Sequence, residues 1–485
     1  MRTAKRFFLI FLVTLFSMAQ IFAQDWYDDW GDGSASNSTE KSVGGFWDKF
    51  KISGDASLGG RIYFDGESAG KTEARAIPEL KLGLDYEGSS TNFNARINLS
   101  ERTLLHNQID ILDEFRADLF LGDFVLSAGK MKVVWGKGDK LHVVDNFNAN
   151  DYTDFLIPDY LDRRAGEYMF RVQYNAPSIF RLEGIWTPIM RGEVYAEDGR
   201  WVPAKVNTLT QSVMKVLDEN ALSGAKASDL LDMMKIQDNL YPNTNRLEYG
   251  QFGFYGNFSI GMVDIGVSYY NGHYKQVSAN MLSTMTALGK ITKGGSISFG
   301  EGMPTLEYDK LQVFGLDAQA AAGPFTLRAE LAYNLTKDVA GDDPWVHNNS
   351  ISYLAGFDVG IPLHNLNLNV QGTGNFVLKK DKISDSIYKS VDTDSDPTGY
   401  YSNNKIVVQL KDTFYYEKVE AMIKAIYGFE RRDLVLMPEV SYKIRDEWKA
   451  RLSGLFIHNF GDDGDSEFEG WLDNSFIQLS VTYSF

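Results

Sequence analysis

The sequence predicts an antiparallel β-barrel that crosses a membrane with about eighteen strands, and three observations predict it. Apolar and polar residues alternate with a period of two along many segments, which is the period of a strand. The gaps between these segments are alternately short and long. The chain opens like an exported protein, and no later stretch offers about 18 continuous apolar residues for a spanning helix. Without such a helix, a closed barrel is the structure that lets an exported chain span a membrane.

Composition narrows the classes of protein. The 485 residues include 25 Tyr, 31 Phe and 44 Gly but only 12 Pro, which suits long strands joined by tight turns. The length would also fit two or three soluble domains, but large barrels are longer than ordinary domains. The absence of cysteine excludes a disulfide framework and a thiolate nucleophile. A net charge of -17 argues against nucleic acid as a partner.

The chain divides into three parts. Residues 1–23 predict a signal peptide, with a basic start, an apolar core and Ala23 at a suitable cleavage position. A transmembrane anchor is the alternative, but the apolar run is short and polar residues interrupt its end. Residues 24–45 are acidic and then rich in Gly, Ser and Asn, which predicts a flexible lead facing the periplasm. Residues 46–485 form the predicted barrel.

Eighteen segments carry the strand period. The expected strands are 50–64, 77–87, 91–101, 113–122, 123–134, 166–176, 178–188, 248–260, 262–272, 308–321, 324–335, 351–361, 366–378, 404–414, 418–429, 433–444, 447–459 and 474–485. Connections after even-numbered strands are short and most of those after odd-numbered strands are long. This predicts short periplasmic turns and long extracellular loops. The return at 429–433 is the weakest, so sixteen strands is the alternative.

The last strand has the clearest faces. Ile477, Leu479, Val481, Tyr483 and Phe485 lie on one side, and polar residues lie on the other. It resembles the C-terminal strand of Gram-negative outer-membrane barrels, which implies that Tyr483 and Phe485 form a signal for the barrel assembly machinery. The chain is then expected in the cell outer membrane with outer-membrane lipids around it. The alternative is the edge strand of a soluble sheet.

If apolar faces point to lipid, the other faces line a lumen. In 123–134 the pattern places Val125, Met131 and Val133 outward. The first seven strands then turn nine basic and six acidic side chains inward, and a basic lining favours anionic solutes. The alternative is that these charges pair across strands and only hydrate the lumen. The predicted pore-lining cations are Lys81, Arg96, Arg116, Lys130, Lys132, Arg171 and Arg181.

The loop after the fifth strand carries the most distinctive motif. It is similar to a porin-like family with Trp-Gly-x-x-Asp followed by Asp-x-x-Asn-Pro-x-Asp, and Ala149 stands here in place of the usual proline. In architecture the chain is also similar to outer-membrane exporters of acidic polysaccharide. The resemblance implies a porin-like protein, and most members of the family have no assigned substrate. The charged and aromatic residues predict a loop folded inward that narrows the pore, with solute contact as an additional role. The predicted constriction-loop residues are Trp135, Gly136, Asp139, Asp145, Asn148, Asp151, Arg163 and Arg164.

Other motifs point to no chemistry. The six histidines lack His-Glu-x-x-His spacing, and no Gly-x-Ser-x-Gly elbow is present. Asp392 to Asp396 begins like a calcium loop, but Pro397 and Asn403 stand at the glycine and glutamate positions. No enzyme activity, metal or cofactor is therefore expected. Helical spacing within 204–239 predicts short amphipathic helices at the barrel mouth, and a solvated excursion is the alternative.

These observations together predict an outer-membrane channel for passive diffusion of small hydrophilic, and by its lining anionic, solutes. One rival is a surface-exposed adhesin or structural barrel with a plugged lumen. A second rival is an uptake channel for hydrophobic compounds, which the polar inward faces disfavour, and an outer-membrane hydrolase is the least favoured. The sequence leaves open the oligomeric state and whether the 189–247 loop occludes the pore.

Overall fold

The structure is a computed structural model. It describes residues 49–64, 73–105, 107–155, 159–176, 180–196, 199–203, 241–293, 304–396, 398–462 and 465–485. The expected signal peptide (1–23), the expected flexible lead (24–45) and the expected loop helices (204–239) lie outside the described residues. They stay predictions.

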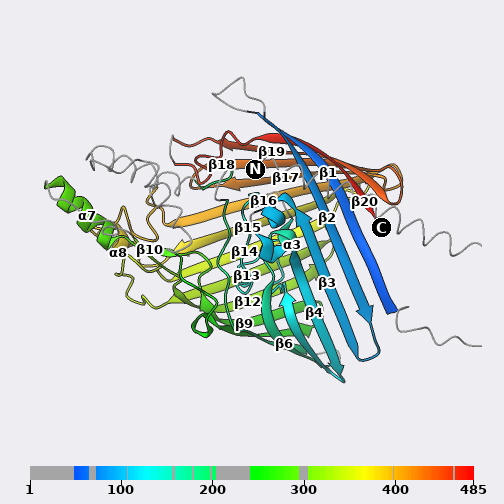
Figure 1. The fold of residues 1–485 in the computed structure, drawn as a ribbon, viewed down its shortest axis with the longest axis horizontal. Coiled ribbons are helices and arrows are strands. Elements are labelled where there is room, and N and C mark those ends of the chain that lie inside the picture. Colours follow the sequence, from blue (N-terminus) through cyan, green and yellow to red (C-terminus); the bar gives the residue numbers. More distant parts are fainter. Residues whose placement is uncertain are drawn as a thin grey trace, which may run out of the picture.

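Eighteen antiparallel strands form one closed barrel, which confirms the fold class and the strand number expected from the sequence. The strands are β1 (Phe50–Tyr63), β2 (Glu73–Glu87), β3 (Thr91–Ser100), β4 (Leu112–Leu121), β5 (Phe124–Met131), β6 (Glu167–Asn175), β7 (Phe180–Thr187), β8 (Gln251–Ile260), β9 (Val263–His273), β12 (Lys310–Ala322), β13 (Phe325–Thr336), β14 (Ser350–Gly360), β15 (Asn367–Val377), β16 (Ser402–Phe414), β17 (Val419–Gly428), β18 (Asp433–Lys443), β19 (Trp448–Asn459) and β20 (Phe476–Ser484). The strands run obliquely side by side (Figure 1).

Pairing of the first and last strands closes the barrel. β1 and β20 are antiparallel neighbours from Asp55 opposite Ser484 to Tyr63 opposite Phe476. The short return at 429–432 joins β17 and β18 as separate paired strands, so the sixteen-strand alternative is wrong. Turns of a few residues connect the strands at one end of the barrel, and the long connections gather at the other end.

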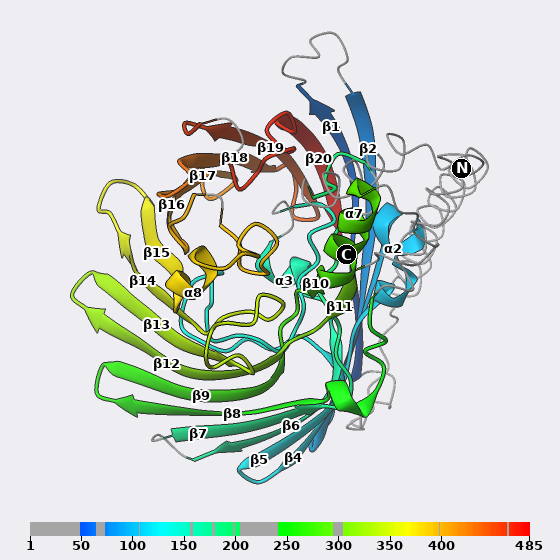
Figure 2. The same cartoon turned by 90° about the vertical axis from the view of Figure 1, so that its left-hand side faces the viewer.

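The described connections contain a few short elements. They are α2 (Glu101–Leu105), η2 (Gln108–Asp110), α3 (Tyr160–Arg163), η3 (Leu247–Tyr249), α7 (Leu282–Thr292), α8 (Lys380–Ser384) and a two-stranded sheet of β10 (Ser278–Asn280) and β11 (Thr305–Glu307). Seen from one end of the barrel, α3 lies within the ring of strands (Figure 2). Among the described residues, no helix is long and apolar enough to cross a membrane.

The outward face of the barrel is apolar and exposed. Leu58, Leu316 and Leu479 are 63%, 49% and 56% exposed although each lies within a strand. Alternate residues in the same strands, such as Asp317, turn inward and are buried. A soluble sheet would bury its apolar face, so this arrangement is that of a barrel surrounded by lipid.

The faces of β5 differ from the prediction. Phe124 and Leu126 are exposed on the outside, whereas Met131 and the adjacent Val133 are 2% and 4% exposed inside the barrel. Val125 pairs with the inward-facing Gln173. The sequence was misread here because the lumen side of this strand is also apolar, so hydrophobicity alone does not distinguish the two faces.

The predicted pore-lining position of Lys130 is wrong as well. It pairs with Phe115 and Tyr168, which both face outward, and it is 2% exposed. Its ammonium donates to the carbonyls of Ile109 and Leu112 at 2.9 and 2.6 Å, under the segment that precedes β4. Lys130 therefore does not line a pore.

Two apolar clusters fill part of the lumen. The first packs residues from the connection after β5 against the inner wall of β6–β9, β12 and β13, and consists of Met131, Val133, Trp135, Val144, Phe147, Met169, Ile185, Tyr255, Tyr270, Leu311, Val313 and Ala332. The second joins three connections to β1 and β18–β20 and consists of Tyr63, Phe155, Trp201, Val435, Leu455, Ile457, Phe468 and Phe476. The connection from β5 to β6 contributes to both clusters, so it crosses the interior.

Replacing Leu316 by Arg tests the lipid-facing side. Leu316 lies near the middle of β12, and a charge there has to enter the apolar layer, so we expect a loss of about 2–4 kcal/mol in the free energy of unfolding. Gln319→Arg is the control, because Gln319 faces inward opposite Asp264 on the neighbouring strand. Reversible urea unfolding in lipid vesicles measures both variants, and equal losses would contradict the assignment of faces.

Candidate functional site

The connection between β5 and β6 (residues 132–166) forms the inner part of the barrel, and Trp135 fixes its start. Trp135 is 1% exposed and donates from Nε1 to a carboxylate oxygen of Glu183 on β7 at 2.8 Å. Its ring contacts Phe147 edge to face at 5.0 Å and stacks on Tyr255 at 5.6 Å. A buried indole needs a hydrogen-bond acceptor and a large apolar surface, and the lumen side of the wall supplies both.

Glu330 on β13 holds the turn that follows. Its carboxylate, fully buried, accepts hydrogen bonds from the backbone N–H groups of Lys137, Gly138 and Val143 at 2.8, 2.7 and 2.8 Å. It also lies 2.9 Å from Nδ1 of His142. One carboxylate thus satisfies three backbone donors that the loop carries into the barrel, where unpaired donors are costly.

Gly136 allows the loop to approach this carboxylate. Its φ is 104°, a conformation that L side chains rarely adopt. A Cβ at this position would overlap the carboxylate of Glu330 and the ring of His142. Glycine in the Trp-Gly motif is therefore required by the loop geometry rather than by chemistry.

An ion pair and several hydrogen bonds within the loop hold its middle part together. Arg164, 3% exposed, pairs with Asp145 at 2.8 Å, and Tyr160 donates to the same carboxylate at 2.8 Å. Burial raises the pKa of Tyr160, and the Asp145 charge raises it further, so the phenol stays a donor. Asn148 accepts from the N–H of Val133 and donates to two backbone carbonyls. The predicted motif residues thus brace the loop.

The far part of the loop reaches the opposite side of the barrel. Asp151 pairs with Arg102 of α2, and Asp154 pairs with Arg61 of β1 at 2.7 Å. Phe155 stacks on Trp201 with ring centroids 5.1 Å apart and an interplanar angle of 3°. The loop is therefore fastened to β7 and β13 at one end and to β1 at the other.

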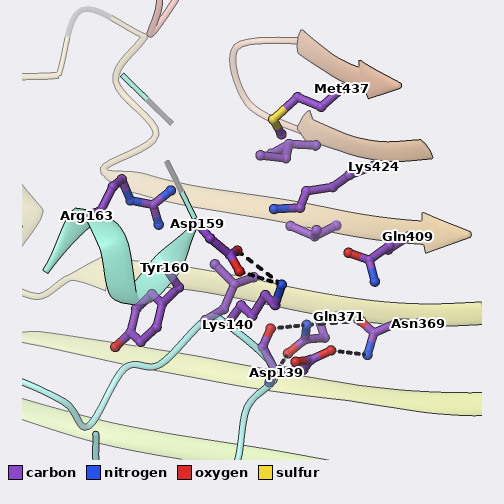
Figure 3. Close-up of a pocket in the computed structure, with 13 residues that line it drawn as sticks. Asp139, Lys140, Asp159, Tyr160, Arg163, Asn369, Gln371, Gln409, Lys424 and Met437 are labelled. Carbon is purple, nitrogen blue, oxygen red and sulfur yellow. Dashed lines mark hydrogen bonds and ion pairs between the residues drawn. The ribbon is translucent and has the colours of Figure 1, made fainter. Parts of the chain in front are cut away.

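A cavity remains between this loop and the wall formed by β15–β18 (Figure 3). It is about 560 Å³, including space open to solvent. Its lining comes from the loop on one side and from four neighbouring strands on the other. The lining residues are Asp139, Lys140, Leu141, Asp159, Tyr160, Arg163, Asn369, Gln371, Val407, Gln409, Lys424, Ile426 and Met437.

Most charges in the cavity already have partners. Lys140 pairs with Asp159 at 2.9 Å. Burial raises the pKa of Asp159, but the hydrogen bond from Lys140 outweighs this and the net pKa is lowered. Asp139 accepts from Asn369 at 3.1 Å, and its backbone is held by Gln371. The loop is thereby fastened to β15 at the edge of the cavity.

The predicted pore-lining cations mostly lie in ion pairs. Lys81 pairs with Asp162 of the loop at 3.1 Å, and Lys132 pairs with Asp113 at 2.8 Å. The other pairs lie within the wall: Arg96 with Asp85 at 2.8 Å, Arg116 with Asp118 at 3.1 Å, and Arg171 and Arg181 with Glu183 at 2.7 and 3.0 Å. These residues are brought to one side of the barrel, away from the cavity that β15–β18 line.

The wall residues of the cavity were missed by the sequence analysis. Asn369, Gln409 and Lys424 lie on β15, β16 and β17, and only the first seven strands were considered for the lining. The signal was present, because Gln409 and Lys424 alternate with Leu410 and Ile423, which are exposed on the outside. The alternation of the later strands therefore contained these positions.

A further group of titratable residues joins three long connections, those after β9, β13 and β15. Nδ1 of His347 lies 2.8 Å from Asp394, and the same carboxylate accepts from the N–H of Asn348 at 2.6 Å. The N–H of His347 donates to Asp309 at 3.0 Å, and Tyr274 packs on the imidazole ring at 4.4 Å. Among the described residues, no group of three or more His, Cys, Asp or Glu has the geometry of a metal site.

Comparison with known proteins adds little beyond the fold. The sequence matches no protein-family profile and no curated protein. Similar solved structures include OccAB4 of Acinetobacter baumannii (10% identity, 90% of this chain and 98% of that chain, TM-score 0.45) and a BenF-like porin of Pseudomonas fluorescens Pf-5 (9%, 91% and 99%, 0.45). The outer membrane channel DcaP of Acinetobacter baumannii is similar as well (8%, 90% and 97%, 0.40). Because these TM-scores are below 0.5, the fold assignment rests on the strand pairing described above. The resemblance of the loop motif to a porin-like family stays a prediction.

Replacing Glu330 by Ala tests the anchor of the loop. Three backbone N–H groups would lose a buried acceptor, so we expect the free energy of unfolding to fall by about 3 kcal/mol or more. We also expect the loop to detach and residues 135–145 to become accessible to protease in the folded barrel. The control is Glu420→Ala on β17, whose carboxylate is partly exposed and pairs with Lys411. Protection of the loop in the Glu330 variant would contradict the anchoring role.

The His347 cluster predicts that the connections after β13 and β15 are sensitive to pH. Burial lowers the pKa of His347, but Asp394 outweighs it and the net pKa is raised; burial raises the pKa of Asp392 to about 6. Groups with a raised pKa stabilise the folded state at low pH, and this stability is lost as pH rises through the folded pKa. We therefore expect hydrogen exchange in 337–349 and 380–396 to accelerate as pH rises from 5 to 9, after correction for the intrinsic rate.

Two histidine variants separate the contribution of His347 to this pH dependence from that of the other groups. His347→Gln should flatten the dependence above pH 6.5, whereas His364→Gln should not, because His364 is 48% exposed at the opposite end of the barrel. An unchanged profile in the His347 variant would assign the effect to other groups.

Proposed function

We propose that the protein is an outer-membrane channel for passive diffusion of small hydrophilic solutes. The short turns face the periplasm, the long loops face outside, and solutes pass between the loop 132–166 and the wall of β15–β18. The observation that carries this proposal is a cavity with charged and amide side chains inside a barrel whose outside is apolar. No catalytic residue, metal or cofactor belongs to the proposal.

The cavity has the character of a pore constriction. Charged groups of both signs line it, and three amide side chains stand on the strands opposite the loop. These polar groups can replace part of the water around a hydrophilic solute. The loop is fastened at Trp135, Glu330, Arg164 and Asp154, which supports a constriction of fixed size rather than a closing lid.

The preference for anions rests on the charge balance of the cavity. Lys140, Arg163 and Lys424 face Asp139 and Asp159, which leaves one net positive charge. Burial lowers the pKa of Arg163, but the ordinary value is so high that the guanidinium stays charged near neutral pH. The cations of the first seven strands contribute less, because they lie in ion pairs.

For assembly, we propose Tyr483 and Phe485 as the signal read by the barrel assembly machinery. Phe485 exchanges backbone hydrogen bonds with Gly54 at 2.9 and 3.0 Å, and its ring is 41% exposed on the outside. The C-terminal strand thus keeps its aromatic end accessible while it closes the barrel on β1.

A barrel with a plugged lumen is the rival that a specific observation favours. The two apolar clusters occupy opposite sides of the interior, and the connection between β5 and β6 spans the space between them. Such a protein would serve as a surface-exposed adhesin or a structural barrel. An open channel requires that the cavity beside β15–β18 continues through the barrel, whereas a plugged barrel requires that it ends inside.

Planar bilayer recording separates these functions. We expect the mature protein to give stable conductance steps, and in a tenfold KCl gradient a reversal potential with the sign of anion preference. Heat-modifiable migration on gels verifies that the reconstituted barrel is folded. Absence of conductance from a verified barrel would overturn the channel, and cation preference would overturn the charge argument while the channel stands.

A further inference from the structure

Two lysines face each other on the inner wall at the end of the barrel where the short turns lie. Lys443 ends β18, and Lys449 stands directly opposite it near the start of β19. Both side chains are on the inward face, because Tyr442 and Leu452 at alternate positions are exposed on the outside. Like charges directly opposite each other on a sheet repel. Among the described residues, no acidic side chain forms an ion pair with either ammonium.

The neighbouring charges do not cancel this lysine pair. Glu420 pairs with Lys411 at 2.7 Å, and Glu439 pairs with Arg451 at 3.3 Å, so both acids of the adjacent wall have their own cation. The turn 444–447, which lies beyond the wall, carries one cation and two acids. One positive charge is therefore left over even when this turn is counted, and it faces the lumen.

Two exposed tyrosines stand beside the lysine pair. The turn that joins β16 and β17 is held against β18, because the N–H of Lys443 donates to the carbonyl of Lys418 at 2.8 Å. Tyr415 and Tyr416 in this turn are 66% and 93% exposed. With Glu417 they form three consecutive residues of positive φ (52°, 55° and 61°), a conformation that costs free energy in residues other than glycine. A strained turn that presents two aromatic rings to water is typical of an interaction surface.

The same chain contains a segment of complementary chemistry. Residues 25–32 (Asp-Trp-Tyr-Asp-Asp-Trp-Gly-Asp) carry four acids, three aromatic rings and no cation. Residues 33–45 are rich in Gly, Ser and Asn, which is the composition of a flexible tether. The tether leads to Phe50, where β1 begins at the same end of the barrel as the C-terminus and the short turns (Figure 1).

The tether is long enough for this segment to reach the lysine pair. Lys449 is opposite Thr482, and Thr482 is opposite Ser57, so Lys449 lies two strands and seven residues away from Phe50. At about 3.3 Å per residue and 4.8 Å per strand, the separation is about 25 Å. The 18 residues from 33 to 50 span about 23 Å on average as a flexible chain and about 60 Å when extended. Such a tether gives an effective concentration on the order of millimolar.

From this complementarity we infer that residues 25–32 dock on the basic surface formed by Lys443 and Lys449. Carboxylates of the segment lie between the two ammonium groups, and its aromatic rings contact Tyr415, Tyr416 and the lysine side chains. The docked segment covers part of the barrel opening at the short-turn end and thereby restricts the passage of solutes. This restriction rests on the proposed function, whereas the docking itself does not require conduction.

Zero-length cross-linking of the folded mature protein tests where the segment lies. A carbodiimide joins a carboxylate to an ammonium in direct contact, and trypsin leaves residues 24–41 as one peptide. We expect mass spectrometry to find this peptide joined to Lys443 or Lys449 of the same chain in a mixture of light-isotope and heavy-isotope protein. Equal yields at Lys310 and Lys337, at the long-loop end, would overturn the docking surface. Links between light and heavy chains would overturn docking within one chain in favour of a second copy.

The mobility of the segment provides an independent measurement. The chain has no cysteine, so Ser34→Cys carries a single nitroxide label next to the acidic residues. We expect the spectrum to contain an immobilised component that falls roughly threefold when Lys443→Gln and Lys449→Gln are combined, as the loss of two exposed ion pairs predicts. Salt at about 0.5 M should have the same effect, because the Debye length is then only about 4 Å.

Lys310→Gln combined with Lys337→Gln is the matched control, because it removes the same charge at the other end of the barrel. Lys411→Gln is the local control, since that cation already pairs with Glu420. We expect both controls to leave the immobilised component unchanged. Equal release of the label by the distant control would overturn the docking surface in favour of the general field of the protein.

The outcomes for the docked segment and for the channel are distinct. A barrel that conducts while the label shows no immobilised component overturns the docking and leaves the channel. A barrel that holds the segment at Lys443 and Lys449 but does not conduct supports the docking and overturns passive diffusion. Heat-modifiable migration of each variant ensures that release of the label is not loss of folding.

Discussion

An eighteen-stranded barrel is wider than its own inward side chains can fill, and the interior of this protein follows from that constraint. The space is divided by the connection between β5 and β6, which brings its own apolar residues to both sides of the barrel. Inward positions next to this connection include apolar residues such as Met131 and Val313 and the buried acceptors Glu183 and Glu330. The remaining cavity is lined by a mixture of polar and apolar side chains.

A loop inside a barrel has to satisfy its backbone, and this explains which wall residues are charged. Some of its N–H groups pair with backbone carbonyls in isolated bridges, and buried side chains accept others, with Glu330 taking three and Asn148 taking one. The same requirement fixes Gly136, because the chain must pass close to the carboxylate. Some charged residues of the lumen thus hold the loop and others do not. Those that hold the loop are unsuited to hold a solute.

The barrel was predictable from sequence because lipid makes the outward face uniformly apolar, so that strands such as β20 alternate cleanly. The prediction failed at β5, where Met131 and Val133 are apolar on the lumen side, and hence at Lys130. The motif around Trp135 and Asp145 indicated an inward loop, but its partners on distant strands, Glu183 and Glu330, follow from the closed topology and not from local sequence. The inward position of Lys424 follows from the same alternation, because Ile423 beside it is exposed on the outside.

Pairing, rather than the count of charges, determines what the lumen offers to a solute. Arg171 and Arg181 both contact Glu183, and Lys81 contacts Asp162, so cations that look like a basic wall in the sequence are largely neutralised by nearby acids. Lys424 differs because its neighbours on the adjacent strands are Gln409 and Met437, neither of which carries a charge. A single lysine between uncharged cross-strand neighbours therefore leaves more net charge on the inner wall than arginines that face carboxylates.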